Sequence, residues 1–314
     1  MAAALLFPGQ GSQALGMGKA LSEAFAPARA VFEEVDAALG EKLSAIMWQG
    51  PADKLTLTEN AQPALMAVSL ATIRVLEAEA GLDISRDAKF VAGHSLGEYS
   101  ALAAAGSLTI SDTARLLRVR GSAMQKAVPV GEGAMAALIG LSLDDAASVA
   151  AEAAQGAVCQ AANDNGAGQV VISGSKAAIE RAIEIAKKKG AKRAMLLPVS
   201  APFHCAMMQP AADAMAEALS QVEVKAPRVP VVANVLAQPV TDPAEIVRCL
   251  VAQVTGTVRW RECVSYMAQN GVTTFYEIGA GKVLTGLVKR ITEGASAIAI
   301  GVPEDIAVFK ATRS

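Results

Sequence analysis

The chain has few cysteines, only two histidines and no excess of positive charge, and each shortage narrows its possible functions. The four cysteines among 314 residues form no C-x-x-C pair and have no zinc-site spacing. They indicate reduced thiols of an intracellular protein, without a disulfide framework or a metal site. The net charge of −2 gives no general attraction to nucleic acid or to an anionic membrane, so we expect neither partner.

Long apolar runs are also missing. The opening MAAALLFPGQ has a short apolar segment without a basic region, and Pro8 and Gly9 end it, so it predicts a first strand and not a signal peptide. The alanine-rich segments farther along contain Gly, Ser, Glu or Arg too often to span a bilayer. We therefore expect a cytoplasmic protein without membrane attachment.

Hydrophobic residues make up 53% of the chain and charged residues 18%, which is typical of a compact globular protein. The first part of the chain alternates apolar strands with amphipathic helices. Strands separated by helices predict an α/β fold with a parallel sheet that is covered on both faces. The strands are expected at 3–7 and 89–93, and the main helices at 20–39 and 62–81.

From about Val128 the order changes to strand, helix, strand, strand, helix, strand. The order βαββαβ is the ferredoxin-like split unit, which can fold as a layer of its own. Strands then return at 229–235, 273–279 and 296–302. We predict a large α/β domain, residues 1–127 and 200–314, interrupted by an inserted ferredoxin-like domain, residues 128–199, with a cleft between them.

The segment VAGHSLGEYSAL places Ser95 between a predicted strand and a predicted helix. G-x-S-x-G at such a junction is the signature of a nucleophile elbow, in which glycines permit a tight turn that exposes the hydroxyl. The alternative is that Ser95 merely caps the N-terminus of the helix.

A serine nucleophile needs a base within hydrogen-bonding reach, and only His94 and His204 are available. His94 adjoins Ser95 in an extended segment, so its side chain should project to the opposite side. His204 follows the last strand of the inserted domain, where the chain returns to the cleft. We predict a Ser95–His204 dyad, although a lone histidine in a loop is often only a structural hydrogen-bonding group. No acid stands out to orient it, which argues against an ordinary esterase.

A second glycine-rich turn, FPGQGSQALGMGK, follows the first predicted strand. It formally matches a relaxed dinucleotide-binding pattern, but the chain after it is helical and lacks the expected second strand, and the Walker A pattern fails. Acyl transfer needs two backbone N–H groups at the oxyanion, and those of Gln10 and Leu96 form a natural pair. The alternative is a purely structural turn.

Arg120 lies on the apolar face of its predicted helix, together with Leu116, Leu117 and Met124. A guanidinium that points into an apolar interior is costly unless a carboxylate pairs with it. That carboxylate is either an Asp or Glu of the chain or part of a substrate.

In chain order, several segments resemble the malonyl-CoA:acyl carrier protein transacylases of bacterial fatty acid synthesis and the related acyltransferase domains of polyketide synthases. Each segment alone is unspecific, but together they cover nearly the whole chain and are highly specific. The resemblance implies a hydrolase-like large domain and a ferredoxin-like inserted one, in agreement with the pattern above. The matching segments are FPGQGSQ, GHSLGEYSAL, RG with the following MQ, NDNGAGQVVISG, PFHC and YEIGAGKVLTGL.

The resemblance implies a ping-pong reaction in which Ser95 takes malonyl from coenzyme A and passes it to the phosphopantetheine thiol of acyl carrier protein. His204 would act as general base and acid, Gln10 and Leu96 as oxyanion donors, and Arg120 as the group that binds the free malonyl carboxylate. The coenzyme A thioester is a substrate, and no cofactor or metal is implied. We expect a monomer.

Supporting roles follow from the same resemblance. Gln253 matches the position whose backbone carbonyl orients the histidine. Gln62 and His94 match residues near the site, and Phe203 matches the bulky residue associated with malonyl over methylmalonyl in the polyketide relatives.

Other functions remain open at this point. A serine esterase or thioesterase shares the elbow and the base but has no obvious use for Arg120, and a carrier-binding scaffold would show no acylation of Ser95. The sequence does not say whether the protein serves fatty acid synthesis alone or also a polyketide pathway. Two clusters could contact an acidic carrier protein or could be ordinary solvated side chains: Lys187, Lys188, Lys189, Lys192 and Arg193, or Lys282, Lys289 and Arg290.

Overall fold

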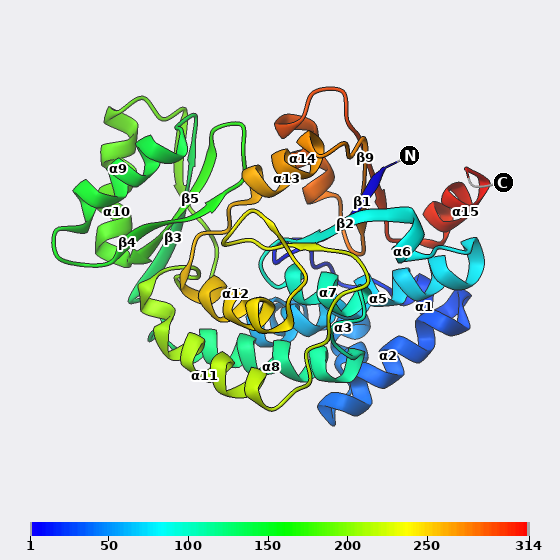
Figure 1. The fold of residues 1–314 in the computed structure, drawn as a ribbon. Helices are drawn as coiled ribbons and strands as arrows, with labels where there is room; N and C mark the ends of the chain where they lie inside the picture. The colour runs from blue at the N-terminus through cyan, green and yellow to red at the C-terminus, as the bar shows by residue number, and fades with distance from the viewer. Residues whose placement is uncertain (1, 313–314) are drawn as a thin grey trace.

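The computed structural model describes residues 2–312, so the outermost residues of the expected large domain lie outside it. The described residues form two separate β-sheets surrounded by helices (Figure 1). The larger sheet has six strands in the order β10-β9-β1-β2-β7-β8, and the smaller has four in the order β4-β5-β3-β6. The expected mixed α/β fold, with a parallel sheet and a separate antiparallel one, is confirmed.

The six-stranded sheet is parallel except at one edge, where β8 pairs antiparallel with β7. Its strands are β1 (Ala3–Phe7), β2 (Ala88–Gly93), β7 (Val231–Val232), β8 (Pro239–Val240), β9 (Thr274–Ile278) and β10 (Ser296–Ile300).

β1 lies inside this sheet and is buried at all of its positions, as its unbroken apolar run predicts. Leu5 and Phe7 join the hydrophobic core on one face, while Ala4 and Leu6 join the core on the other, because successive side chains of a strand point to opposite faces. The register pairs Phe7 with Gly93. The turns that follow β1 and β2 therefore leave the sheet at the same edge.

Helix α5 is buried along most of its length and contributes to the core on one face of the sheet, whereas α13 and α14 pack on the other face. Helices α2, α7 and α8 pack around α5. The helices of this part are α1 (Lys19–Ala24), α2 (Ala26–Leu39), α3 (Leu43–Gln49), α4 (Ala52–Thr56), α5 (Thr58–Ala80), α6 (Ile84–Asp87), α7 (Gly97–Ala104), α8 (Ile110–Lys126), α11 (Gln209–Ser220), α12 (Pro243–Thr255), α13 (Trp260–Gln269), α14 (Val283–Ile291) and α15 (Pro303–Ala311), with a 3₁₀ turn at Ala206–Met208.

The prediction of one helix over 20–39 is wrong, because the structure divides this segment into α1 and α2. Phe25 between them is extended, with φ −131° and ψ 124°. Pro27 is the physical cause, since it has no N–H for the carbonyl of Glu23 and its ring would clash there in a continuous helix. In the structure Pro27 occupies the first turn of α2, where a proline is tolerated.

The four-stranded sheet follows the predicted order of elements and is antiparallel throughout. Helices α9 and α10 cover one face and form a separate hydrophobic core with it, seen at the left of Figure 1. The opposite face carries Met135 and Val171 toward the core of the large sheet. The elements are β3 (Gly133–Ile139), α9 (Leu143–Ala154), β4 (Cys159–Asp164), β5 (Gln169–Ser175), α10 (Lys176–Lys188) and β6 (Arg193–Leu196).

Backbone hydrogen bonds join β4 of the small sheet to the segment before α13. Val258, just before α13, donates to the carbonyl of Ala162 and accepts from the N–H of Asp164. The end of β4 is thus held to a segment whose Val258 packs in the core on one face of the large sheet, next to the turn between β4 and β5.

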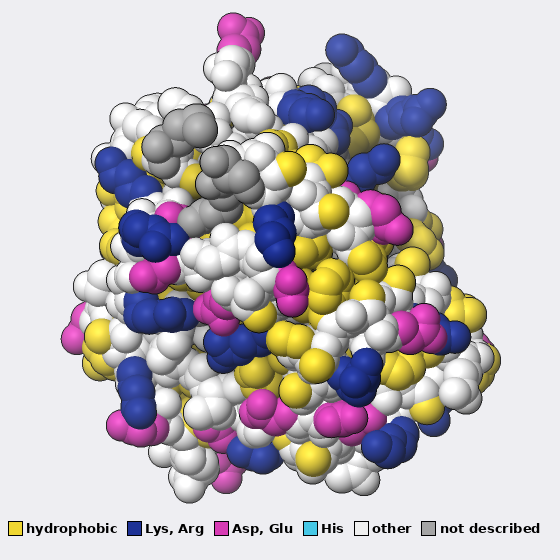
Figure 2. Space-filling view, turned by 90° about the vertical axis from the view of Figure 1, so that its right-hand side faces the viewer, with side chains coloured by type: hydrophobic (Ala, Val, Ile, Leu, Met, Phe, Trp, Pro, Cys, Tyr) yellow, Lys and Arg dark blue, Asp and Glu magenta, His cyan; other side chains and the backbone are white. Residues whose placement is uncertain are grey.

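The surface seen in Figure 2 mixes basic and acidic side chains with apolar ones, and neither histidine is visible on this face. Such mixing agrees with the net charge of −2. Within residues 2–312, none of the helices combines the length and the apolar character needed to cross a membrane.

Candidate active site

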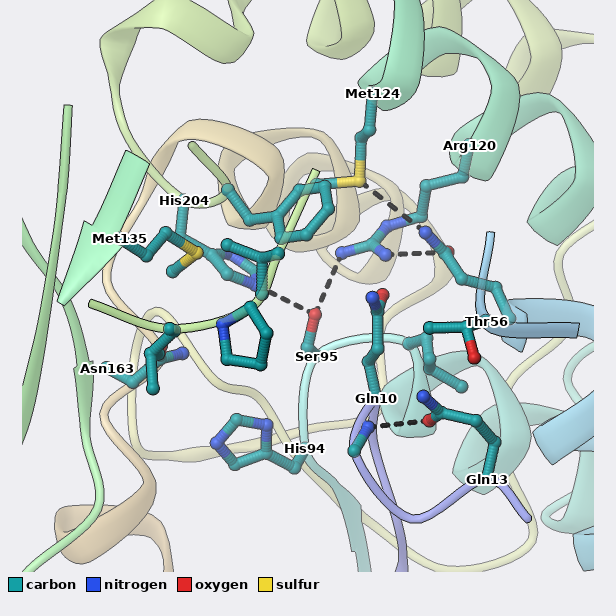
Figure 3. Close-up of a pocket in the computed structure, with 17 residues that line it drawn as sticks. Gln10, Gln13, Thr56, His94, Ser95, Arg120, Met124, Met135, Asn163 and His204 are labelled. Atoms are coloured by element: carbon teal, nitrogen blue, oxygen red, sulfur yellow. Dashed lines mark hydrogen bonds between the residues drawn. The ribbon is translucent and has the colours of Figure 1, made fainter. Parts of the chain in front are cut away.

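A cleft of about 460 Å³ lies between the two sheets. Its floor contains Ser95 and the turn after β1, and its walls come from α8, from β3 and from the segment that leads out of the small sheet (Figure 3). Residues from seven separate stretches of the chain line it: Gln10, Gly11, Gln13, Thr56, Gln62, His94, Ser95, Leu96, Arg120, Met124, Met135, Asn163, Leu197, Pro198, Val199, Phe203 and His204.

Ser95 occupies a tight turn between β2 and α7 in the left-handed conformation, with φ 53°. Glycine is required on both sides of this turn. A Cβ on Gly93 would lie 1.9 Å from the carbonyl of Gly97, and one on Gly97 would lie 2.2 Å from the Phe7 oxygen. The residue that caps α7 is Leu96, and no side chain caps it, so the interpretation of Ser95 as a helix cap is wrong.

The Ser95 hydroxyl contacts His204, whose Nε2 is 2.8 Å from Oγ. The other ring nitrogen, Nδ1, is 2.8 Å from the backbone carbonyl of Gln253. A carbonyl only accepts, so Nδ1 carries the proton and Nε2 is left to accept the proton of Ser95. Burial, together with the nearby charge of Arg120, lowers the pKa of His204 to about 3, so the imidazole is neutral at pH 7.

His94 also lines the cleft, but its ring bonds away from Ser95 (Figure 3). Its Nε2 is 3.0 Å from Oδ1 of Asn165, in the turn between β4 and β5, and the ring lies 5.5 Å from that of Trp260. Burial lowers the pKa of His94 as well. The geometry places His94 between the two sheets and leaves His204 beside the hydroxyl.

The backbone N–H groups of Gln10 and Leu96 lie on the two turns that leave the sheet at the same edge. Within the described chain neither N–H donates to an acceptor. The side chain of Gln10 is held by the Thr58 hydroxyl, which donates to its Oε1 at 2.9 Å. Two unused donors that flank a reactive hydroxyl have the arrangement of an oxyanion hole.

Arg120 is 1% exposed, and within the part of the chain that the structure describes its guanidinium donates only to uncharged groups. Nη1 donates to Gln62 Oε1 at 2.7 Å, and Nη2 to Gln253 Oε1 at 2.8 Å and to Ser95 Oγ at 3.1 Å. Among the described residues, Nε has no hydrogen-bond partner and no carboxylate forms an ion pair with Arg120. The internal salt bridge that the sequence left open is therefore excluded for residues 2–312.

Apolar side chains narrow the cleft beside these polar groups. Phe203 is 8% exposed and precedes His204, while Met124 and Met135 reach in from α8 and β3 (Figure 3). Gln62 is fixed by its Nε2, which donates to Thr58 Oγ1 at 2.9 Å and contacts the sulfur of Met124 at 3.7 Å. Its Oε1 is thereby turned toward Arg120.

Sequence reasoning missed two buried residues that hold these groups, Asn234 and Glu98. Asn234 Oδ1 accepts from the N–H of Ser95 at 2.8 Å, and its Nδ2 donates to the Gly93 carbonyl at 2.8 Å. Glu98 Oε2 accepts from the N–H of Asn234 at 3.0 Å and from Gln253 Nε2 at 2.9 Å. Two sequence signals could have found them: Asn234 is an amide near the end of a buried strand, and Glu98 is the lone acid of an otherwise uncharged helix.

Within the described residues, no group of three His, Cys, Asp or Glu side chains could hold a metal ion. The polar groups of the cleft are instead a hydroxyl, an imidazole, a guanidinium and amides. This set suits nucleophilic acyl transfer to and from a carboxylate-bearing group.

Comparison with known proteins agrees with that chemistry. Residues 4–303 match the acyl transferase domain family, so the chain is an acyltransferase by class. Its sequence is 47% identical over 304 residues to the malonyl CoA-acyl carrier protein transacylase of Bacillus subtilis (strain 168), covering 96% of this chain and 94% of that one. The chain belongs to the malonyl CoA-acyl carrier protein transacylase family, and the resemblance seen in the sequence is confirmed.

Solved structures agree with this assignment. The crystal structure of an acyl-carrier-protein S-malonyltransferase from Bartonella henselae is 60% identical, with a TM-score of 0.97, and covers 100% of this chain and 99% of that one. A malonyl-transacylase solved in complex with its type II PKS acyl-carrier protein is 43% identical, with a TM-score of 0.95, and covers 99% of this chain and 100% of that one.

Proposed function

We propose that the protein transfers malonyl from malonyl-CoA to the phosphopantetheine thiol of acyl carrier protein, through a malonyl-Ser95 intermediate. The observation that carries the proposal is Arg120, a buried guanidinium without a carboxylate partner among the described residues, 3.1 Å from the Ser95 hydroxyl. The names of the relatives, and the relative solved with a carrier protein, support the same substrates.

In the first half-reaction Ser95 Oγ attacks the thioester carbonyl while its proton passes to His204 Nε2. The carbonyl oxygen becomes an oxyanion that accepts from the N–H groups of Gln10 and Leu96. When this intermediate collapses, the C–S bond breaks and the departing sulfur of coenzyme A takes the proton from His204. No proton is gained or lost overall.

The second half-reaction repeats these steps in reverse with a different thiol. The phosphopantetheine sulfur gives its proton to His204 and attacks the malonyl ester. Ser95 Oγ then leaves and recovers that proton. The Gln253 carbonyl keeps Nδ1 protonated throughout, so Nε2 serves both as base and as acid.

Selectivity follows from the short separation of the nucleophile and the guanidinium. One methylene group separates the carbonyl and the carboxylate of malonyl, so both reach their partners when Ser95 Oγ and Arg120 Nη2 are 3.1 Å apart. The buried aromatic ring of Phe203 restricts the space for a branched acyl group.

The parallel sheet with its elbow supports a hydrolase-like description of the large domain, and the order β4-β5-β3-β6 supports a ferredoxin-like one for the inserted domain. We propose that the coenzyme A thioester is a substrate and that the protein needs no bound cofactor. A monomer in the cytoplasm stays a prediction.

The test is intact-mass spectrometry after mixing with malonyl-CoA, followed by peptide mapping. We expect one malonyl adduct, on Ser95, that disappears when a carrier thiol is added. A thioesterase would release malonate equally fast with and without the carrier, and a scaffold would give no adduct. Either result would contradict the proposal.

A further inference from the structure

The mechanism above makes no use of Glu98, although its carboxylate is 2% exposed and lies within the active-site network. Glu98 belongs to α7, one turn after Ser95. Both of its donors, the N–H of Asn234 and Nε2 of Gln253, bond to the same oxygen, Oε2. Within residues 2–312 its other oxygen, Oε1, accepts no hydrogen bond.

The side-chain amide of Gln253 links Glu98 to Arg120. Its Nε2 donates to Glu98 Oε2 at 2.9 Å and to the Ser95 carbonyl at 3.0 Å, while its Oε1 accepts from Arg120 Nη2 at 2.8 Å. A carboxylate only accepts and a guanidinium only donates, so this is the one amide orientation that satisfies every partner. Glu98 and the Ser95 carbonyl therefore set which end of the Gln253 amide faces Arg120.

Among residues 2–312, Glu98 and Arg120 are the only two charged side chains in this network. The other titratable groups that interact with Glu98 electrostatically are Tyr99 on the same helix, Cys249 on α12 and Cys263 on α13. The buried faces of α5, β1, β2 and β7, which also pack on α7, carry no charged side chain among the described residues. Arg120 thus has one carboxylate near it, that of Glu98, and the side-chain amide of Gln253 lies between the two.

We propose that Glu98 shares Arg120 with the substrate: its carboxylate is the counter-charge of Arg120 in the unloaded enzyme, and it takes up a proton from the solvent when the malonyl carboxylate binds there. This inference rests on the proposed malonyl transfer. A second carboxylate on Arg120 places two negative charges around one cation in a buried site, which disfavours ionisation of Glu98. The proton can sit on Oε1 without displacing either donor from Oε2.

The electrostatics support this assignment. Burial raises the pKa of Glu98 to about 7, so the carboxyl is poised to change its protonation near neutral pH. His204 also lies near Arg120, but its pKa of about 3 keeps it neutral in this range. In the loaded enzyme the pKa of Glu98 rises further, so the protein takes up protons when malonyl is loaded.

The experiment counts protons with a pH indicator in weakly buffered solution while malonyl-CoA is mixed with the wild-type protein at pH 7. The acyl transfer itself is proton-neutral, so the indicator reports Glu98. We expect an uptake of roughly half a proton per malonyl-Ser95 formed, because a group at its pKa is half ionised. Glu98→Gln should show none, and Glu180→Gln, a matched change at an exposed position of α10, should behave like wild type.

The wild-type protein alone also tests the proposal, should Glu98→Gln fail to fold. The uptake should disappear at about pH 5.5, where Glu98 is already protonated before loading. An uptake that is the same at both pH values, or the same in Glu98→Gln, would overturn the role of Glu98 even though malonyl-Ser95 forms. The absence of a malonyl adduct would instead overturn the proposed function.

Discussion

Arg120 is held so that its charge faces the Ser95 hydroxyl. Amides occupy part of its donor capacity, and its Nε has no partner within the described chain. Because removing a guanidinium from a desolvated site leaves a bound carboxylate uncompensated, this residue should decide which acyl group is loaded.

Arg120→Ala should lower malonyl loading by roughly 30-fold or more, since truncating one partner of a buried charge pair costs on the order of 2–5 kcal/mol and about 1.4 kcal/mol is tenfold. Acetyl loading should hold or rise. Arg120→Lys should recover only part of the loss, because an ammonium lacks the two-pronged geometry. The measurement is the ratio of Ser95 loading from malonyl-CoA and from acetyl-CoA. An unchanged ratio in Arg120→Ala would assign recognition of the carboxylate to another group.

His204→Ala should lower the rate of Ser95 acylation by roughly 10²–10⁴-fold, the usual effect of removing a general base. Rapid quenching followed by intact-mass spectrometry measures that rate. Ser95→Ala, which lacks the acceptor oxygen, should give no adduct at all. If His204→Ala acylated at the wild-type rate, the base would have to be sought at His94.

The sequence located the residues of the proposed site better than the residues that hold them. Ser95 and Arg120 stand out because glycines at fixed spacing and a cation on an apolar helix face are local patterns. Asn234 contacts Ser95 from 139 positions away, so no local pattern connects the two. The Glu98–Gln253 contact likewise spans 155 positions and depends on how α7 and α12 pack.

At the scale of elements, the periodic segments were predicted well and the interrupted ones were not. The helix at 143–154 and the strands of the small sheet follow directly from their apolar periodicity. The break at Phe25 was missed because the apolar pattern continues across it while Pro27 ends the hydrogen bonding. The strand expected at 229–235 shrinks to Val231–Val232, since only this part pairs with a neighbour.

Helix α8 carries Arg120 and is positioned by the next residue, Gly121. A Cβ there would lie 2.5 Å from the Glu59 Cα and 2.7 Å from the Thr58 carbonyl oxygen, at the start of α5. Gly121→Ala should therefore push α8 away from α5, lower the free energy of unfolding by on the order of 1–3 kcal/mol, and reduce malonyl loading.

Gly286→Ala is the matched control for Gly121→Ala, because Gly286 also lies within a helix and its nearest atom beyond the local backbone is 3.9 Å away. This change should keep or slightly raise stability through better helix propensity. Chemical denaturation and the Ser95 loading assay measure both variants. Equal effects of the two substitutions would show that close packing at Gly121 does not position Arg120.

At the scale of the whole molecule, buried Glu98 makes stability depend on pH. Its pKa is about 7 in the folded protein against an ordinary 4.5, so between these values the folded protein keeps a proton that the unfolded chain has released. The contribution of Glu98 to the free energy of unfolding is therefore fully present below pH 4.5 and is lost as the pH rises to about 7.

Glu98→Gln should remove this loss of stability, because a glutamine side chain has the shape of the glutamic acid but does not ionise. Relative to the variant, the wild-type protein should lose about 3 kcal/mol of unfolding free energy between about pH 4.5 and pH 7. Urea denaturation of both proteins at about pH 5 and about pH 8 measures the difference. The same pH dependence in both proteins would show that Glu98 is not a buried acid of raised pKa.

The proximity of Arg120 to His204 has a further consequence for discrimination between acyl groups. Burial, and after it the charge of Arg120, makes His204 reluctant to accept a proton. A malonyl carboxylate on Arg120 offsets part of that second effect, whereas an acetyl group does not, and burial still keeps the imidazole neutral. A wrong acyl group is therefore disfavoured twice: it binds without its counter-charge, and the base that activates Ser95 is still opposed by the full charge of Arg120.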